Sequence, residues 1–160
     1  IYRARSDVNS VVHSHSNSMI TVGVVSTQTL RPVCHMCGFL GRGAPVFEIR
    51  DVAGDSSNLL ISSPKLGSAL AEKLDSSDVV LMRGHGSTAV APTVKLAVYR
   101  AIYAETNARI QNAATGLGPV TYLTPGEAEA TDETIIAHVD RSWSYWKSAL
   151  TRDVAISLIT

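Results

Sequence analysis

Three of the five histidines in the sequence have a type and spacing suited to binding a metal ion. His13 and His15 lie at the end of a predicted buried strand, and residues two apart on a strand point to the same side, so both rings can reach one ion. His85 lies between two glycines in the sequence RGHG (residues 83–86), which directly follows the apolar run at residues 79–82, in a loop that can approach the other two histidines closely. Three neutral imidazoles leave a coordination position of a divalent ion open for substrate, as in catalytic metal sites. We therefore predict a metal site formed by His13, His15 and His85.

Other polar side chains are candidates for supporting roles. Arg83 precedes His85 by two residues and could pair with a substrate carboxylate, although a structural ion pair is an equal alternative. Glu105 could orient a ligand histidine through a hydrogen bond, or be buried for structural reasons. His138 falls in a polar helical stretch, where we expect a surface position.

The two cysteines, Cys34 and Cys37, form a single C-x-x-C sequence. A structural zinc site needs four ligands, and a thioredoxin-like dithiol normally lies where a strand meets the start of a helix. Neither context is evident, so we expect unrelated reduced thiols. Because the sequence has no signal peptide and no N-x-[ST] sequon, we also expect a cytoplasmic protein.

Composition excludes several classes of partner. The chain has 160 residues, with 14 Lys+Arg against 14 Asp+Glu and 45% apolar residues, which suits one domain over residues 1–160. No Lys/Arg-rich run is present to bind nucleic acid, and no apolar stretch approaches the roughly 20 residues of a membrane-spanning helix. The sequence opens with Ile1 and a stretch typical of a helix end and a turn. We expect that the N-terminal part of a longer protein is missing.

Patterns along the chain predict the elements that must position these residues. Strands are expected at residues 8–15, 30–33, 45–49 and 79–82. Helices are expected at residues 16–27, 63–74 and 93–116, and from the capping box at Thr124 through Trp146. Residues 38–43 and the segment after Gly86 are expected to be loops. Strands followed by helices indicate an α/β sandwich around one sheet.

Together these pieces resemble the class II aldolase/adducin family. The matching segments are VNSVVHSHS (residues 8–16), LRPVCHMCGFLG (30–41), APVFE (44–48), VVLMRGHGSTAV (79–90) and AVYRAIYAETNARIQNAA (97–114). They follow the family's order and approximate spacing to about residue 128. An H-x-H pair followed about 70 residues later by a strand ending in G-H-G is the most specific part of the resemblance.

The resemblance implies a three-layer α/β/α sandwich with a central, mostly antiparallel sheet, and a homotetramer with active sites at subunit interfaces. His13, His15 and His85 would be the ligands of a divalent ion: zinc in the aldolases, or manganese or another ion in the decarboxylase branch. The ion would act as a Lewis acid on a small hydroxy-carbonyl or hydroxy-carboxylate substrate and would stabilise an enolate. His35 and Arg83 would contact that substrate.

Departures from the family pattern refine the hypothesis. Family aldolases carry their acid/base carboxylate in a P-S-S-E-like segment upstream of H-x-H, which would lie before Ile1, so we assign no catalytic residue. Cys37 stands where the epimerase branch has an aspartate, which argues against epimerisation. The apolar segment 35–41 is similar to that of family members that decarboxylate hydroxylated aromatic or pyridine carboxylates, although its residues could instead pack at a subunit interface. We predict a metal-dependent carbon–carbon lyase, an aldolase or a decarboxylase; the alternatives are a non-catalytic adducin-like assembly module and an inactive fragment.

Overall fold

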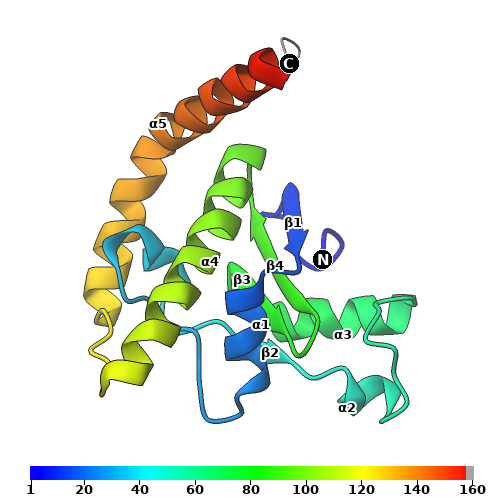
Figure 1. Cartoon of the computed structure of the whole chain (residues 1–160). Helices are drawn as coiled ribbons and strands as arrows, with labels where there is room; N and C mark the ends of the chain where they lie inside the picture. The colour runs from blue at the N-terminus through cyan, green and yellow to red at the C-terminus, as the bar shows by residue number, and fades with distance from the viewer. Residues whose placement is uncertain (158–160) are drawn as a thin grey trace.

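The computed structural model describes the backbone of residues 1–157 and the side chains of residues 1–150 (Figure 1). In chain order the elements are β1 (Ser10–Ser14), α1 (Asn17–Val24), the 3₁₀-helix η1 (His35–Leu40), β2 (Val46–Phe47), α2 (Arg50–Ala53), α3 (Pro64–Leu74), β3 (Val79–Met82), β4 (Gly86–Ala91), α4 (Val94–Leu117) and α5 (Pro125–Ser157). Within this part of the chain, none of the helices combines the length and apolar character needed to cross a membrane.

The four strands form one sheet in the order β1-β4-β3-β2. β4 pairs antiparallel with both β1 and β3, and β2 pairs parallel with β3. Every residue of β3 and β4 is buried, as expected for the two central strands. The predicted α/β fold with a mostly antiparallel sheet is confirmed.

The side chains of β3 separate two hydrophobic cores, one on each face of the sheet. Val79 and Leu81 pack in a core shared with α1, η1 and α4, whereas Val80 and Met82 pack in a core shared with α3. Successive residues of a strand point to opposite faces, so a run of four apolar residues requires cover on both sides. Figure 1 shows α4 and α3 on opposite sides of the strands, which gives the predicted three layers.

The predicted starts of the three longest helices are confirmed by their caps. The hydroxyl oxygen of Ser63 accepts a hydrogen bond from the backbone at the start of α3, and that of Thr93 does the same for α4. At α5, Thr124 and Glu127 form the expected reciprocal pair of side chain–backbone hydrogen bonds. These caps satisfy backbone N–H groups that have no partner inside the helix.

Residues 30–33 do not form the predicted strand. Leu30 makes one isolated bridge with Ala44, and the following residues hydrogen-bond to two buried amide side chains of α4. Asn107 accepts from the backbone N of Val33 (2.9 Å) and donates to the carbonyl of Arg31 (2.7 Å).

Gln111 continues this arrangement one helical turn further along α4. Its side chain accepts from the backbone N of Arg31 (3.0 Å) and donates to the carbonyl of Thr29 (2.8 Å). The two amides supply the donors and acceptors that a neighbouring strand would otherwise supply. The backbone of this segment therefore finds its hydrogen-bond partners on a helix and not on a neighbouring strand.

The predicted loop after Gly86 is wrong, because Gly86–Ala91 forms the central strand β4. Its sequence, GSTAVA, lacks the alternation and bulky side chains that signal a strand, and burial between two neighbouring strands decides its structure instead. Smaller corrections concern residues 38–43, of which 38–40 belong to η1, and residues 45–49, where the strand is limited to β2 and precedes the unpredicted α2. Helix α1 is also shorter than residues 16–27.

Replacing Asn107 with leucine should destabilise the fold, because the substitution keeps the volume and removes both hydrogen bonds to the 31–33 backbone. We expect the free energy of unfolding to fall by about 1–3 kcal/mol in urea titrations. Asn112→Leu is the matched control, since Asn112 is half-buried and its amide makes one 3.2 Å hydrogen bond, to Ser18. Equal losses in the two variants would contradict a specific role for Asn107.

Candidate metal centre

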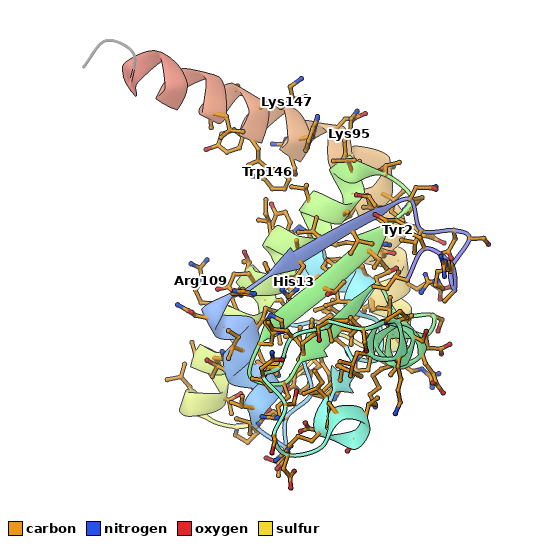
Figure 2. The ribbon with its side chains drawn as sticks, turned by 90° about the vertical axis from the view of Figure 1, so that its right-hand side faces the viewer. Tyr2, His13, Lys95, Arg109, Trp146 and Lys147 are labelled. Atoms are coloured by element: carbon orange, nitrogen blue, oxygen red, sulfur yellow. The ribbon has the colours of Figure 1, made fainter. Side chains whose placement is uncertain are left out.

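The three predicted ligands lie at the place where β1 ends beside the turn between β3 and β4. The β1–β4 register pairs Ser14 with Ser87, and the β3–β4 register pairs Met82 with Gly86. The end of β1 and the turn that carries His85 therefore meet at one edge of the sheet. Figure 2 shows His13 close to the end of the β1 arrow, where the chain passes into α1.

The imidazole rings of His13, His15 and His85 converge through their Nε2 atoms. Nε2 of His15 lies 3.1 Å from Nε2 of His13 and 3.1 Å from Nε2 of His85. The ring centroids are 4.8 to 4.9 Å apart in all three pairs. The structure thus brings together the three residues that the sequence selects from five histidines.

Hydrogen bonds among three neutral imidazole rings cannot give every Nε2 atom of this cluster a partner. Nδ1 of His13 lies 2.9 Å from the carbonyl oxygen of Ser87, which can only accept, so Nδ1 carries the proton and Nε2 offers a lone pair. Nε2 of His15 lies within hydrogen-bonding distance of both Nε2 of His13 and Nε2 of His85. If it carries a proton, this N–H can form a well-aligned hydrogen bond with only one of them. A single cation can accept the lone pairs of all three nitrogens.

The spacing and chemistry of the cluster fit a divalent metal ion. Two imidazole nitrogens bound to zinc at about 2.0–2.1 Å in tetrahedral coordination lie about 3.4 Å apart. The two separations from Nε2 of His15, 3.1 Å each, are close to that value, and the candidate ligand atoms of all three residues lie within 4.8 Å of one another. Imidazole nitrogen suits zinc and also other transition metals. Three histidines therefore indicate a transition metal but do not distinguish zinc from the others.

The electrostatic surroundings favour the neutral form of His13 that a metal requires. Burial lowers the pKa of His13, and the neighbouring rings of His85 and His15 lower it further, against the opposing effect of the Ser87 carbonyl. A ligand histidine commonly donates its second N–H to a fixed acceptor, which orients the ring. Ser87 supplies that acceptor through its backbone, a role that side-chain patterns cannot reveal.

Comparison with known proteins identifies the family of the chain. The sequence model described as "Class II Aldolase and Adducin N-terminal domain" matches residues 1–112. The chain belongs to the class II aldolase and adducin family. All three histidines of the cluster lie inside the matched region.

Individual members of the family show how much of their length this chain covers. The decarboxylase tropJ of Talaromyces stipitatus is 38% identical over 167 residues, which cover 91% of this chain and 62% of that protein. The 3,4-dihydroxyphthalate decarboxylase of Arthrobacter keyseri is 28% identical over 123 residues, covering 74% of this chain and 46% of that protein. The solved structure of an L-fuculose 1-phosphate aldolase has the same fold, with a TM-score of 0.67, 21% identity, and coverage of 84% of this chain and 58% of that one. The chain thus spans under two thirds of the length of these family members.

Arg83 lies in the same turn as His85, but its side chain forms an ion pair with Glu48, just after β2. Glu48 also pairs with Arg50 at 2.8 Å, and the hydrogen bonds from Arg50 and Arg83 lower the pKa of Glu48 to about 2. The structural ion pair left open by the sequence is therefore present. It ties the turn that carries His85 to the end of β2.

His35 is not brought to the three histidines, whereas Glu105 lines a cavity together with Ser14 and Ser16, which flank His15. His35 lies on η1 and lines a separate cavity of about 430 Å³ between η1, α4 and α5, together with Tyr103, His138 and Trp146. Glu105 lies on α4, and among the described residues its Oε2 is buried without a hydrogen-bond partner. The backbone carbonyl of Ser87, and not Glu105, hydrogen-bonds to Nδ1 of His13 and orients that ring.

Gly86 is required by the close approach of two backbone segments beside the histidines. A Cβ atom at this position would lie 2.1 Å from the carbonyl oxygen of Ser14, between His13 and His15. No neighbouring side chain can move to relieve this contact, because the obstructing atom belongs to the backbone. A side chain here would push the His85 turn away from the end of β1.

Each of the three histidines should be necessary for metal binding. We expect His13→Ala, His15→Ala and His85→Ala each to weaken zinc binding by more than about 100-fold, since loss of an outer-shell partner alone costs 10–100-fold. Isothermal titration calorimetry measures the change. His138→Ala is the control, because that exposed side chain hydrogen-bonds within its own helix. Unchanged affinity in any one of the three ligand variants would remove that residue from the site.

Gly86→Ala should weaken metal binding although it removes no ligand. The added methyl group forces the His85 turn away from Ser14, so we expect zinc affinity to fall by about 10–100-fold, as for other losses of ligand positioning. The control is Gly116→Ala, where the added Cβ meets no atom within 4 Å. Wild-type affinity in a folded Gly86→Ala variant would contradict the requirement for close approach.

Proposed function

We propose that this chain is part of a divalent-metal-dependent carbon–carbon lyase, and that the reaction is the decarboxylation of a small hydroxylated carboxylate. The observation that carries the proposal is the convergence of three imidazole Nε2 atoms that their own hydrogen bonds do not satisfy. A scaffold such as the adducin-like alternative has no need of such a cluster.

The choice of decarboxylation rests on the sequence relatives. The relatives described above, at 38% and 28% identity, are both named decarboxylases. The L-fuculose 1-phosphate aldolase structure is 21% identical and supports the fold alone. An aldolase therefore ranks second, although both reactions leave negative charge on carbon after a carbon–carbon bond breaks.

A divalent ion held at this site would supply Lewis-acid stabilisation of that negative charge. The chain's own residues prepare the site for it. The Ser87 carbonyl fixes the tautomer of His13 so that Nε2 faces the other two rings, and partial burial together with the neighbouring rings lowers the pKa of His13, which favours its neutral form. The Arg83–Glu48 ion pair anchors the turn that presents His85.

Several finer features stay predictions. Zinc is the first candidate for the ion, with manganese or another divalent ion as the alternative. A homotetramer, a cytoplasmic location and substrate contacts by His35 or Arg83 also remain proposed. We propose no residue of this chain as the catalytic acid or base.

Carbon dioxide release from a panel of hydroxylated aromatic carboxylates tests the proposal, with 3,4-dihydroxyphthalate included because it is the substrate in the name of one relative. The metal-loaded protein should release carbon dioxide, and His85→Ala should lower the rate by more than about 100-fold. Gly116→Ala, where the added Cβ meets no atom within 4 Å, should retain the wild-type rate. Carbon dioxide release that survives both a chelator and His85→Ala would overturn the metal-dependent mechanism.

A parallel assay with hydroxy-ketone phosphates separates the two lyase reactions. Aldehyde release from such a substrate by the metal-loaded protein, without carbon dioxide release from any carboxylate of the panel, would replace decarboxylase with aldolase. Bound metal at the three histidines with neither product would overturn the lyase assignment.

A further inference from the structure

The two thiols of the chain form a close pair on the far side of α4 from β1. Sγ of Cys34 lies 3.4 Å from Sγ of Cys37, at the start of η1, so the prediction of unrelated thiols is wrong. The pairing follows from the local backbone. The N–H of Cys37 donates to the carbonyl of Cys34 at 3.0 Å, and residues three apart in a 3₁₀-turn lie on the same side.

The two sulfur atoms have different surroundings. Cys34 is half-buried, whereas Cys37 is fully buried, with an exposed fraction of 0%. The thiol of Cys37 donates to the carbonyl of Tyr103 on α4 at 3.3 Å. Solvent and small molecules can therefore reach Cys34, whereas Cys37 is closed to them in this structure.

This asymmetry extends to the ionisation of the pair. When Cys34 loses its proton, the thiol of Cys37 can turn from Tyr103 and donate to the thiolate, which together with the backbone N–H of Met36 lowers the pKa of Cys34 to about 7 against the effect of burial. The same interaction and the burial of Cys37 raise the pKa of the second thiol. Cys34 is therefore the more readily ionised thiol of the pair, and the thiolate is the reactive form of cysteine.

We propose that Cys34 and Cys37 form a redox-active dithiol, separate from the metal centre, which a low-molecular-weight disulfide such as glutathione disulfide converts into an intramolecular disulfide. Cys34 is the attacking thiol and Cys37 the resolving thiol. The proposal rests on the sulfur separation, on the different accessibility of the two sulfurs and on the chain having no third cysteine.

The reaction takes place in two exchange steps. The Cys34 thiolate attacks one sulfur of glutathione disulfide, forms a mixed disulfide and releases one glutathione thiolate. Cys37 then gives its proton to the solvent and attacks the sulfur of Cys34, which releases the second glutathione. The protein loses two electrons and two protons, and one glutathione disulfide becomes two thiols. The sulfurs need to approach by only about 1.4 Å to reach the disulfide length of about 2.05 Å.

Equilibration of the reduced protein with mixtures of reduced and oxidised glutathione tests the proposal. After alkylation of free thiols, intact mass spectrometry should show a single oxidised species that has lost the mass of two hydrogens and carries no glutathione. Cys37→Ser should accumulate glutathione on Cys34, because the resolving thiol is absent. Cys34→Ser should react with glutathione disulfide at least about tenfold more slowly than Cys37→Ser at pH 7. Circular dichroism checks that both variants fold.

The wild-type chain provides a measurement that does not depend on the variants. Its reaction with iodoacetamide under reducing conditions should modify one cysteine first, with a rate that rises around pH 7. Two free thiols at every glutathione ratio would overturn the proposal. So would disulfides that form only between chains, or equal reaction rates for the two serine variants.

Discussion

The meeting of three imidazole nitrogens at one point is the constraint on which the rest of the structure depends. His13 and His15 come with β1, whereas His85 comes about 70 residues later in the β3–β4 turn. Nε2 of His85 can lie 3.1 Å from Nε2 of His15 only if β1 pairs directly with β4 and no side chain separates Ser14 from Gly86. The sheet order β1-β4-β3 meets this requirement, and β4 also brings the Ser87 carbonyl to His13.

The surrounding fold keeps this meeting point in place. Both faces of β3 are packed in hydrophobic cores, so the strand that leads into the His85 turn has little freedom. The Arg83–Glu48 ion pair holds the turn to the end of β2. Farther along the chain, the buried amides of Asn107 and Gln111 hold the 29–33 segment against α4. That segment leads into η1 and its two thiols.

The sequence predicts the candidate ligand residues of the site better than it predicts the backbone contacts that hold those residues in place. The three ligands follow from side-chain type and strand spacing, and the helix starts follow from local caps. β4 was missed because small residues carry little strand signal and burial decides their structure. The predicted strand at residues 30–33 does not form because the hydrogen bonds of this segment go to helix side chains 74 to 80 residues away. The Ser87 carbonyl and the thiol pair likewise depend on backbone geometry, which no residue type encodes alone.

X-ray absorption at the zinc edge of the metal-loaded chain tests the metal centre most directly. If the three histidines hold the ion, the spectrum should show nitrogen or oxygen neighbours at about 2.0–2.1 Å, with the outer scattering typical of imidazole rings and no sulfur shell at about 2.3 Å. The imidazole scattering should weaken in His85→Ala. A sulfur shell, which would point to Cys34 and Cys37, or a spectrum unchanged by His85→Ala, would contradict a three-histidine metal site.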